Sequence, residues 1–261
     1  MNSKSKQVFL LILLVVCLIV INYNFLDKSL EGFFEESEMV FVERVIDGDT
    51  VVFNSSSIRL LGINSPERGE KYYEEAKNFL EKEVLNKTVE LKFGNERYDK
   101  YDRLLAYVFV GQENVNLKLV EKGFANFYFP SGKDFYYDDF EKAWESCLNS
   151  NKNLCEKSQN ICKDCIELKK FDFENEVLVF YNKCLYDCSL EGWEIKDEGR
   201  KNFVFHEFNL KTFSEVQVVV GNGIDNSTTL FWKGEDYVWT KTGDSLFLRD
   251  DEGGLVLWKG Y

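Results

Sequence analysis

The fold is decided by two adjoining runs, VIDGDTVVF at residues 45–53 and SIRLLGINSPE at residues 57–67. Both are rich in β-branched and apolar residues, and a short polar segment separates them, so they predict two consecutive β-strands. Asp47-Gly48 is a tight-turn signal, because glycine tolerates a positive φ and aspartate bonds to its own backbone. Such a turn places the Asp49 carboxylate at a strand edge, where it can face a ligand.

The polar residues of this stretch share a chemical logic. Asp49 and residues 64–65 (Asn-Ser) offer the hard oxygen donors that a divalent cation prefers. Arg59 and, farther along, Arg103 offer guanidinium forks, and Glu67 offers a carboxylate. Hydrolysis of a phosphodiester needs such groups, because guanidiniums and a cation stabilise charge on the phosphate oxygens while a base aligns a water.

These residues belong to a set of motifs that resembles the thermonuclease, or staphylococcal-nuclease-type, family. The motifs are Ile46-Asp47-Gly48-Asp49-Thr50, Arg59-Leu60-Leu61, Pro66-Glu67 and Asp99-Lys100-Tyr101-x-Arg103-x-Leu105-Ala106-Tyr107. Asp-Gly-Asp-Thr alone is a weak signal, whereas several ordered motifs at the family's separations are a strong one. The resemblance covers about residues 39–150 and implies an OB-fold β-barrel with helices around it.

The resemblance implies a Ca²⁺ site made by the side chains of Asp49 and Asn64 and the backbone carbonyl of Ser65. The best-known members have aspartate where this chain has Asn64. Losing one carboxylate is expected to weaken the site, since ligand charge sets calcium affinity, and another divalent ion stays an option. The alternative is that these residues cap turns and hold no metal.

The resemblance also implies roles in catalysis and substrate binding. Arg59 and Arg103 grip the phosphate, and Glu67 orients or deprotonates the attacking water. Lys100 and Tyr101 match positions around the nucleotide, where a tyrosine ring stacks or caps a phosphate. The alternatives are surface ion pairs for the two arginines and an exposed helix-start carboxylate for Glu67.

Composition narrows the function classes. The chain has 261 residues, enough for two modest domains, and 32 basic against 45 acidic side chains give a net charge of −13. This balance argues against a basic surface that follows duplex DNA, although cationic groups focused in one cleft still suit a nuclease. The single histidine, His206, lies far from the motifs, which argues against histidine-dependent metal nucleases and Ser-His hydrolases.

Residues 1–26 are interpreted as a membrane anchor or signal sequence. Two lysines precede the unbroken apolar run at residues 8–21, whose length favours a signal sequence over a spanning helix of about 20 residues. No Ala-x-Ala-like cleavage site follows, however, and residues 22–26 can extend the membrane segment, so an uncleaved anchor is favoured and a cleaved signal stays the alternative. In both cases the rest of the chain is expected outside the cytoplasm, with the acidic residues 27–38 as a tether.

Hydrophobic periodicity predicts the main elements of the 39–150 domain. Helices are expected at residues 71–84 and 115–122 and around residues 140–148, with strands at 88–93 and 104–110. The aromatic run Phe127-Tyr128-Phe129 reaches a nucleotide-contact position of the family, where Phe129 lacks the family's hydroxyl; the run could equally be core.

After a cysteine-containing linker at residues 151–165, the sequence pattern becomes that of an all-β domain. Residues 166–261 consist of short aromatic runs between glycine-containing turns, which predicts an immunoglobulin-like sandwich. Segments 190–197 and 242–248 resemble the lamin-tail domain. This resemblance implies a fold rather than a role, so the partner of this domain stays open.

Six cysteines lie outside the N-terminal segment: Cys147, Cys155, Cys162, Cys165, Cys184 and Cys188. An even number in an exported segment favours disulfides, for which 15 pairings exist. The spacings C-x2-C and C-x3-C also allow zinc binding.

The sequence therefore predicts an exported enzyme that hydrolyses phosphodiester bonds by metal-assisted, in-line water attack, and the family resemblance implies that it is an endonuclease acting on DNA and RNA. The family resemblance implies cleavage that leaves a 3′-phosphate, and a small cleft favours single-stranded or fraying substrates. The competing hypothesis is a non-catalytic OB-fold module that binds nucleic acid or protein, with the lamin-tail-like domain for attachment.

Overall fold

The computed structural model describes residues 11–14, 16–18, 20, 37–99 and 101–261. Much of the predicted anchor or signal and most of the tether lie outside the described residues, as does Lys100. Over the part of the chain that is described, no helix has the length and apolar character needed to cross a bilayer. The chain divides into residues 1–38 and a compact unit of residues 39–261.

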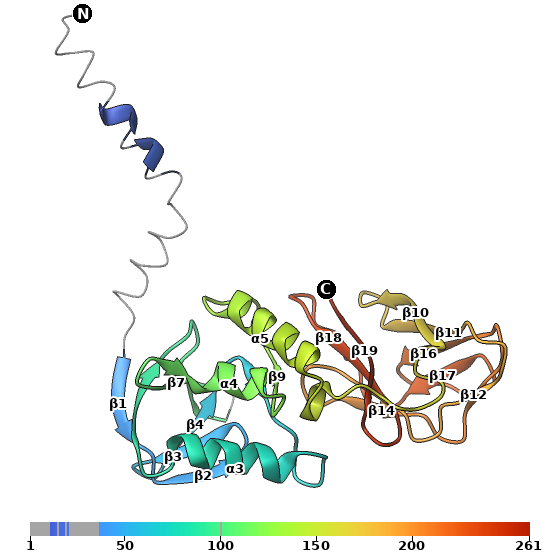
Figure 1. Cartoon of the computed structure of the whole chain (residues 1–261). Helices are drawn as coiled ribbons and strands as arrows, with labels where there is room; N and C mark the ends of the chain where they lie inside the picture. Colours follow the sequence, from blue (N-terminus) through green and yellow to red (C-terminus); the bar gives the residue numbers. More distant parts are fainter. Residues whose placement is uncertain (1–10, 15, 19, 21–36, 100) are drawn as a thin grey trace, which may run out of the picture. The chain divides into compact units, whose positions relative to one another are not determined.

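The first half of the compact unit is built on a mixed sheet of seven strands in the order β1-β6-β7-β4-β3-β2, with β8 paired to β7 (Figure 1). The strands are β1 (Ser37–Phe41), β2 (Arg44–Asp47), β3 (Thr50–Phe53), β4 (Ser56–Leu60), β6 (Thr88–Lys92), β7 (Leu104–Val110) and β8 (Glu113–Asn114). Two further short strands, β5 (Ile63–Asn64) and β9 (Asn126–Phe127), pair with each other.

The strands do not close into the predicted barrel by hydrogen-bond pairing. In the recorded order β1 and β2 are the two ends of the sheet over the described residues. Instead of pairing with each other, β1 and β2 are joined by a bend of the chain at residues 42–43. The Val42 N–H donates to the Lys87 carbonyl beside β6, and the next N–H, of Glu43, donates to the Val52 carbonyl on β3. The ends of the sheet are thus joined by the chain itself rather than by a ladder.

Three helices cover this sheet: α3 (Tyr73–Val84), α4 (Val115–Glu121) and α5 (Tyr137–Ser150). They begin and end close to the positions that the periodicity predicts. The buried face of α5 carries Phe140, Trp144 and Cys147 at helical spacing. Gly123 follows α4 at φ +70°, where a Cβ would lie 2.7 Å from the Lys152 carbonyl oxygen, so only glycine fits.

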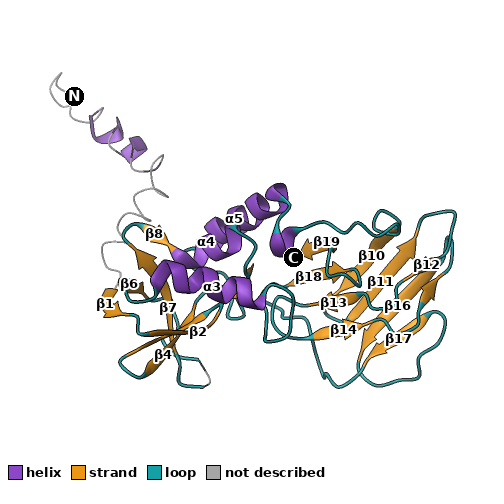
Figure 2. Ribbon diagram, turned by 60° about the horizontal axis from the view of Figure 1, so that its bottom comes forward, coloured by secondary structure: helices purple, strands orange, loops and turns teal. Residues whose placement is uncertain are grey.

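The second half is all β, as predicted, and its two four-stranded sheets enclose a core of its own (Figure 2). One sheet has the order β10-β11-β16-β17 and the other β14-β13-β18-β19, with β12 and β15 as a separate pair. The strands are β10 (Ile166–Asp172), β11 (Val177–Asn182), β12 (Cys188–Ser189), β13 (Glu194–Lys196), β14 (Asn202–Val204), β15 (Asn209–Leu210), β16 (Glu215–Val220), β17 (Thr229–Trp232), β18 (Ser245–Arg249) and β19 (Leu255–Gly260).

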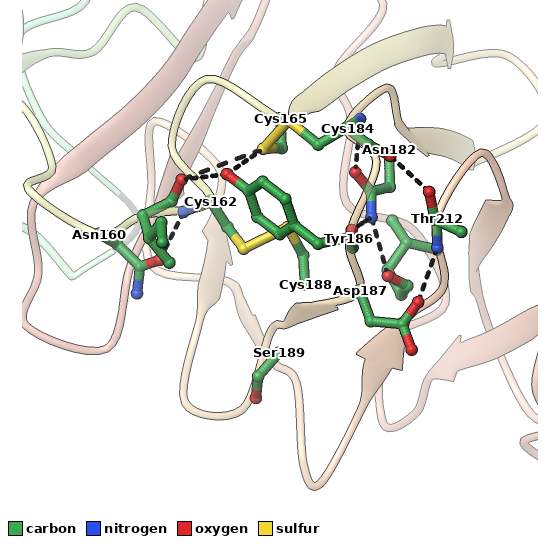
Figure 3. The surroundings of a disulfide bond; sticks show 12 residues. Asn160, Cys162, Cys165, Asn182, Cys184, Tyr186, Asp187, Cys188, Ser189 and Thr212 are labelled. Carbon is green, nitrogen blue, oxygen red and sulfur yellow. Dashed lines mark hydrogen bonds between the residues drawn. A yellow bond between two sulfur atoms is a disulfide. The ribbon is translucent and has the colours of Figure 1, made fainter.

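The prediction of disulfides is confirmed for all six cysteines. Cys147 pairs with Cys155, which fixes the short 3-10 helix η1 (Asn153–Cys155) to the end of α5. Cys162–Cys188 and Cys165–Cys184 tie the entry to the second half to its strands (Figure 3). No thiolate of this set is left for zinc, and three disulfides indicate an oxidising compartment.

The hydrophobic core of the first half extends into the second half. The Trp144 ring lies 5.5 Å from the Phe247 ring and 6.3 Å from the Trp258 ring, between centroids. Trp258 also meets Phe127, and Leu255 belongs to the same buried cluster. Aromatic residues bury large apolar areas, so this contact holds β18 and β19 firmly against α5 and β9.

Buried carboxyl groups lie beside this shared core. Burial, together with the negative charge of Asp244, raises the pKa of Asp197 to about 7 and that of Glu198 to about 8. Burial also raises the pKa of Asp244. Glu198 Oε1 accepts a hydrogen bond of 3.1 Å from the Phe129 N–H. Ionisation of these groups therefore works against the contact between the two halves.

We predict that Glu198→Gln makes the protein less sensitive to alkali. Folding raises the pKa, so the stabilisation is complete below about pH 4 and is lost as the pH rises through about 8. Glutamine keeps an oxygen acceptor for Phe129 but has no proton to lose. The free energy of unfolding in urea at about pH 8 should exceed that of the wild type by about 1–2 kcal/mol.

The exposed carboxyl of Glu191 provides the matched control, since Glu191→Gln removes one acid from the same half without touching the buried group. Identical pH profiles for Glu198→Gln and the wild type would contradict the assignment.

Candidate active site

The register of β3 against β4 builds the centre of the site. Thr50 pairs with Arg59 across these antiparallel strands, and the turn after β2 presents Asp49 next to them. Arg59 Nη1 lies 3.0 Å from Asp49 Oδ2, with Asp49 4% and Arg59 7% exposed. The two residues that the sequence assigns to the metal and to the phosphate therefore form a buried ion pair with each other.

Neighbouring donors complete the environment of the Asp49 carboxylate. Oδ2 accepts hydrogen bonds of 2.7 Å from the Ser65 N–H and 2.8 Å from the Ser65 hydroxyl. Oδ1 accepts one of 3.1 Å from the Thr50 hydroxyl. A buried charge needs such partners, because its desolvation is costly. Ser65 thus serves Asp49 through its N–H and hydroxyl.

Asn64 connects the pair to the second half of the chain. Its Oδ1 accepts a hydrogen bond of 3.1 Å from Arg59 Nη2, and its Nδ2 donates one of 2.7 Å to the Gly199 carbonyl. Asn64 is 3% exposed, so both ends of its amide are satisfied inside the protein. The hydrogen bonds fix which end of the amide faces Arg59.

Asp49, Asn64 and Ser65 carry hard oxygen donors of the kind that a divalent cation prefers. Asp49 Oδ2 and Asn64 Oδ1 converge on one guanidinium, and burial and the charge of Asp49 raise the pKa of Asp47 to about 6. Among the described residues, no three acidic, histidine or cysteine side chains are grouped as metal ligands. Asp49 is the one charged residue of the three, and its Oδ2 already accepts hydrogen bonds from Ser65.

Glu67 lies on the segment between β5 and α3, close in sequence to Asn64 and Ser65. It is not at a helix start, since α3 begins at Tyr73. Its Oε1 lies 2.7 Å from Nε of Arg200, a residue of the second half, and the Glu67 and Arg200 side chains are 45% and 58% exposed. The carboxylate is therefore accessible from solvent, as a base acting on water must be.

Arg103 is held separately by its own acid. Its Nε and Nη2 both lie 2.7 Å from Asp99 Oδ2, and Tyr101, 64% exposed, has its ring 5.5 Å from the guanidinium carbon. Leu105, two residues after Arg103, pairs with Arg59 across parallel strands β4 and β7. Arg103 therefore lies just before β7, the strand next to β4, and over the described residues no hydrogen bond or ion pair joins it to Asp49, Asn64 or Glu67.

Sequence reasoning missed two residues that touch the site. Gly199 and Arg200 belong to an Asp-Glu-Gly turn of the second half, and turn chemistry explains them without any role at a distant site.

Phe129, which stands at the family's nucleotide-contact position, is buried, with its ring 5.2 Å from that of Tyr137 and 5.4 Å from that of Phe140. It is a core residue.

Comparisons with known proteins agree with this architecture. The sequence model of the staphylococcal nuclease homologue family matches residues 57–157, and that of the lamin tail domain matches residues 163–261. The two halves thus have the fold classes expected from their strands, an OB-fold with helices and an immunoglobulin-like all-β domain.

Individual relatives match the first half. The thermonuclease of Staphylococcus intermedius is 31% identical over 162 residues, which cover 56% of this chain and 95% of the relative. That of Staphylococcus hyicus is 32% identical over 161 residues, covering 55% and 94%. Endonuclease YncB of Bacillus subtilis is 32% identical over 133 residues, covering 46% and 62%. The chain belongs to the staphylococcal nuclease family and carries a lamin tail domain as its second half.

Proposed function

We propose that this protein is an exported, divalent-metal-dependent endonuclease that hydrolyses phosphodiester bonds of DNA and RNA by in-line water attack. The observation that carries the proposal is the convergence of Asp49, Arg59 and Asn64, with Glu67 exposed on the segment that follows. The thermonuclease and endonuclease relatives support nuclease activity. The nuclease domain extends over residues 39–150, the linker over 151–165 and the lamin tail domain over 166–261.

In this proposal Asp49, Asn64 and the Ser65 carbonyl hold the divalent ion. The ion, Ca²⁺ in the first instance, would stabilise negative charge that develops on the phosphate oxygens. In the structure Asp49 forms an ion pair with Arg59, and a bound substrate offers the Arg59 guanidinium a new partner. A phosphate suits it, because the planar fork binds two oxygens at once.

Glu67 aligns and deprotonates the water that attacks phosphorus. Its exposure leaves room for both the water and the phosphate. Arg103 binds the same phosphate and assists the leaving oxygen. Asp99 holds Arg103 before substrate arrives: although partial burial opposes ionisation, the N–H groups and guanidinium that face Asp99 lower its pKa. Lys100 and Tyr101 contact the nucleotide next to this group.

Single-stranded or fraying nucleic acid is the proposed substrate. The net charge of −13 disfavours extended binding to a duplex, whereas one exposed strand can present a phosphate to a local cluster of arginines. The three disulfides suit a compartment outside the cytoplasm. The N-terminal segment directs the chain to that compartment, either as a signal sequence or as a membrane anchor.

We predict that Glu67→Gln lowers the rate of single-stranded DNA cleavage by about 10²–10⁴-fold, because the amide cannot take a proton from water. Arg103→Ala should cause a loss of similar size by removing charge that stabilises the transition state. Cleavage of a labelled oligonucleotide by residues 39–261 with millimolar Ca²⁺ measures both, and a chelator should abolish wild-type activity. The same assay with other divalent ions and with RNA shows which metals support cleavage and whether RNA is a substrate.

The matched control is Lys233→Ala, which removes an exposed cation from its ion pair with Asp225 in the lamin tail domain and should leave cleavage unchanged. Uncleaved DNA in the presence of every divalent ion, together with measurable binding, would favour the non-catalytic binding module.

We predict that Asn64→Asp separates metal affinity from stability. A second carboxylate should tighten Ca²⁺ binding and lower the Ca²⁺ concentration for half-maximal cleavage. Aspartate cannot donate to the Gly199 carbonyl, however, so the free energy of unfolding should fall by about 1–3 kcal/mol. Urea denaturation and a Ca²⁺ titration of activity measure the two effects.

Asn126→Asp is the matched control for this substitution. Asn126, which pairs with Asn64 across β5 and β9, donates a hydrogen bond of 2.8 Å from Nδ2 to the Glu198 carbonyl and is not one of the proposed metal ligands. It should lower stability without changing the Ca²⁺ requirement. Undiminished stability of Asn64→Asp would show that the bond to Gly199 contributes little.

A further inference from the structure

The loop between β13 and β14 of the lamin tail domain forms part of the wall of the nuclease site. It is a tight hairpin, in which the Asp197 N–H donates to the Lys201 carbonyl at 3.1 Å and the Lys201 N–H donates to the Asp197 carboxylate at 2.9 Å. Three consecutive residues at its tip contact the nuclease domain. They are Glu198, Gly199 and Arg200.

Two of these contacts are buried and fix the loop in place. Gly199 accepts from Asn64, and Glu198 accepts from Asn126 through its carbonyl and from Phe129 through its carboxylate. Breaking them would leave buried polar groups without partners, each of which carries the full cost of its desolvation. The aromatic contact at Trp144 opposes separation of the domains as well. The loop is therefore a permanent part of the site and not a removable cover.

The third contact is of a different kind. Arg200 and Glu67 are both about half exposed, and exposed ion pairs contribute little to stability. The Arg200 guanidinium therefore sits on a rigid support, and substrate can rearrange it at little cost. The weakness of the pair argues against Arg200 as an inhibitor that must be displaced before Glu67 can act.

The negative charge of Glu67 indicates a role for the Arg200 guanidinium. A phosphate that approaches Glu67 meets a negative carboxylate, and of the three arginines Arg200 is the one paired with Glu67, whereas the other two are paired with Asp49 and Asp99. Arginine presents five N–H donors in a planar fork. With Nε on Glu67, the Nη groups remain able to donate to a phosphate oxygen, so one side chain neutralises both anions.

We propose that Arg200 is a substrate-binding residue of the nuclease site, supplied by the lamin tail domain, and that it binds a phosphate of single-stranded nucleic acid beside Glu67. This inference rests on the proposed function, because it takes the Asp49–Glu67 region to be the site for nucleic acid. It gives the lamin tail domain a direct part in holding the substrate.

Binding of a fluorescent single-stranded oligonucleotide to the full chain, measured by anisotropy in the presence of a chelator, tests the proposal without turnover. Arg200→Ala should weaken binding about tenfold at low salt, as expected for the loss of a charge-assisted hydrogen bond. The slope of log affinity against log salt should fall by about 0.7, the value for one phosphate contact on a single strand. Arg200→Lys should keep the slope and recover part of the affinity, because it retains the charge without the fork.

Lys233→Ala again serves as the matched control and should match the wild type in affinity and slope. Urea unfolding of each variant establishes that it is folded. In cleavage assays Arg200→Ala should raise KM more than it lowers kcat.

The possible results separate this inference from the proposed function. A wild-type protein that cleaves nothing, yet binds more tightly than Arg200→Ala with the steeper slope, upholds the phosphate contact and refutes the nuclease. Equal binding by Arg200→Ala and Lys233→Ala overturns the inference, as does a wild type that does not bind the oligonucleotide. Faster cleavage by Arg200→Ala also overturns it and identifies Arg200 as an inhibitor.

Discussion

The buried ion pair between Asp49 and Arg59 is the constraint around which the nuclease domain is arranged. Taking two charges out of water is costly, and the pair is stable only with partners for its remaining oxygens and N–H groups. Thr50, Asn64 and Ser65 supply them from a strand and from the segment after it. The same requirement fixes the register of β3 against β4, and with it the direction in which the chain continues toward Glu67.

Much of this centre could be predicted from sequence because it is local. The two β-branched, apolar runs correctly indicate strands on both sides of the polar segment, although each run divides into two short strands (β2 and β3, β4 and β5). Helical periodicity places α3, α4 and α5 within a few residues. An even number of cysteines is enough to predict disulfides, although not their pairing. The OB-fold class is confirmed, but the pairing that leaves its sheet open could not be predicted, since no periodicity reveals that the chain bends at residues 42–43 and so carries one end of the sheet to the other.

The contacts from the lamin tail domain could not be predicted, because they depend on how two cores meet. Gly199 lies 135 residues after Asn64, and the turn that contains Gly199 carries no sequence signal of a role at the site. The domains are held together by Trp144, Phe247 and Trp258. In the sequence each of these aromatic residues fits the core of its own domain equally well. Only the assembled core shows that they face one another.

Asn64 illustrates how this docking changes the meaning of a substitution. Judged from the nuclease motif alone, it is an aspartate that has lost its charge, which weakens the ion site. In the folded chain its amide lies between a guanidinium that donates and a carbonyl that accepts, and a buried amide needs both partners. A carboxylate at this position would place an oxygen against the Gly199 carbonyl. The residue that tunes the proposed ion site is therefore also the one that accommodates the second domain, so the chemistry of the site and the attachment of the lamin tail domain cannot vary independently.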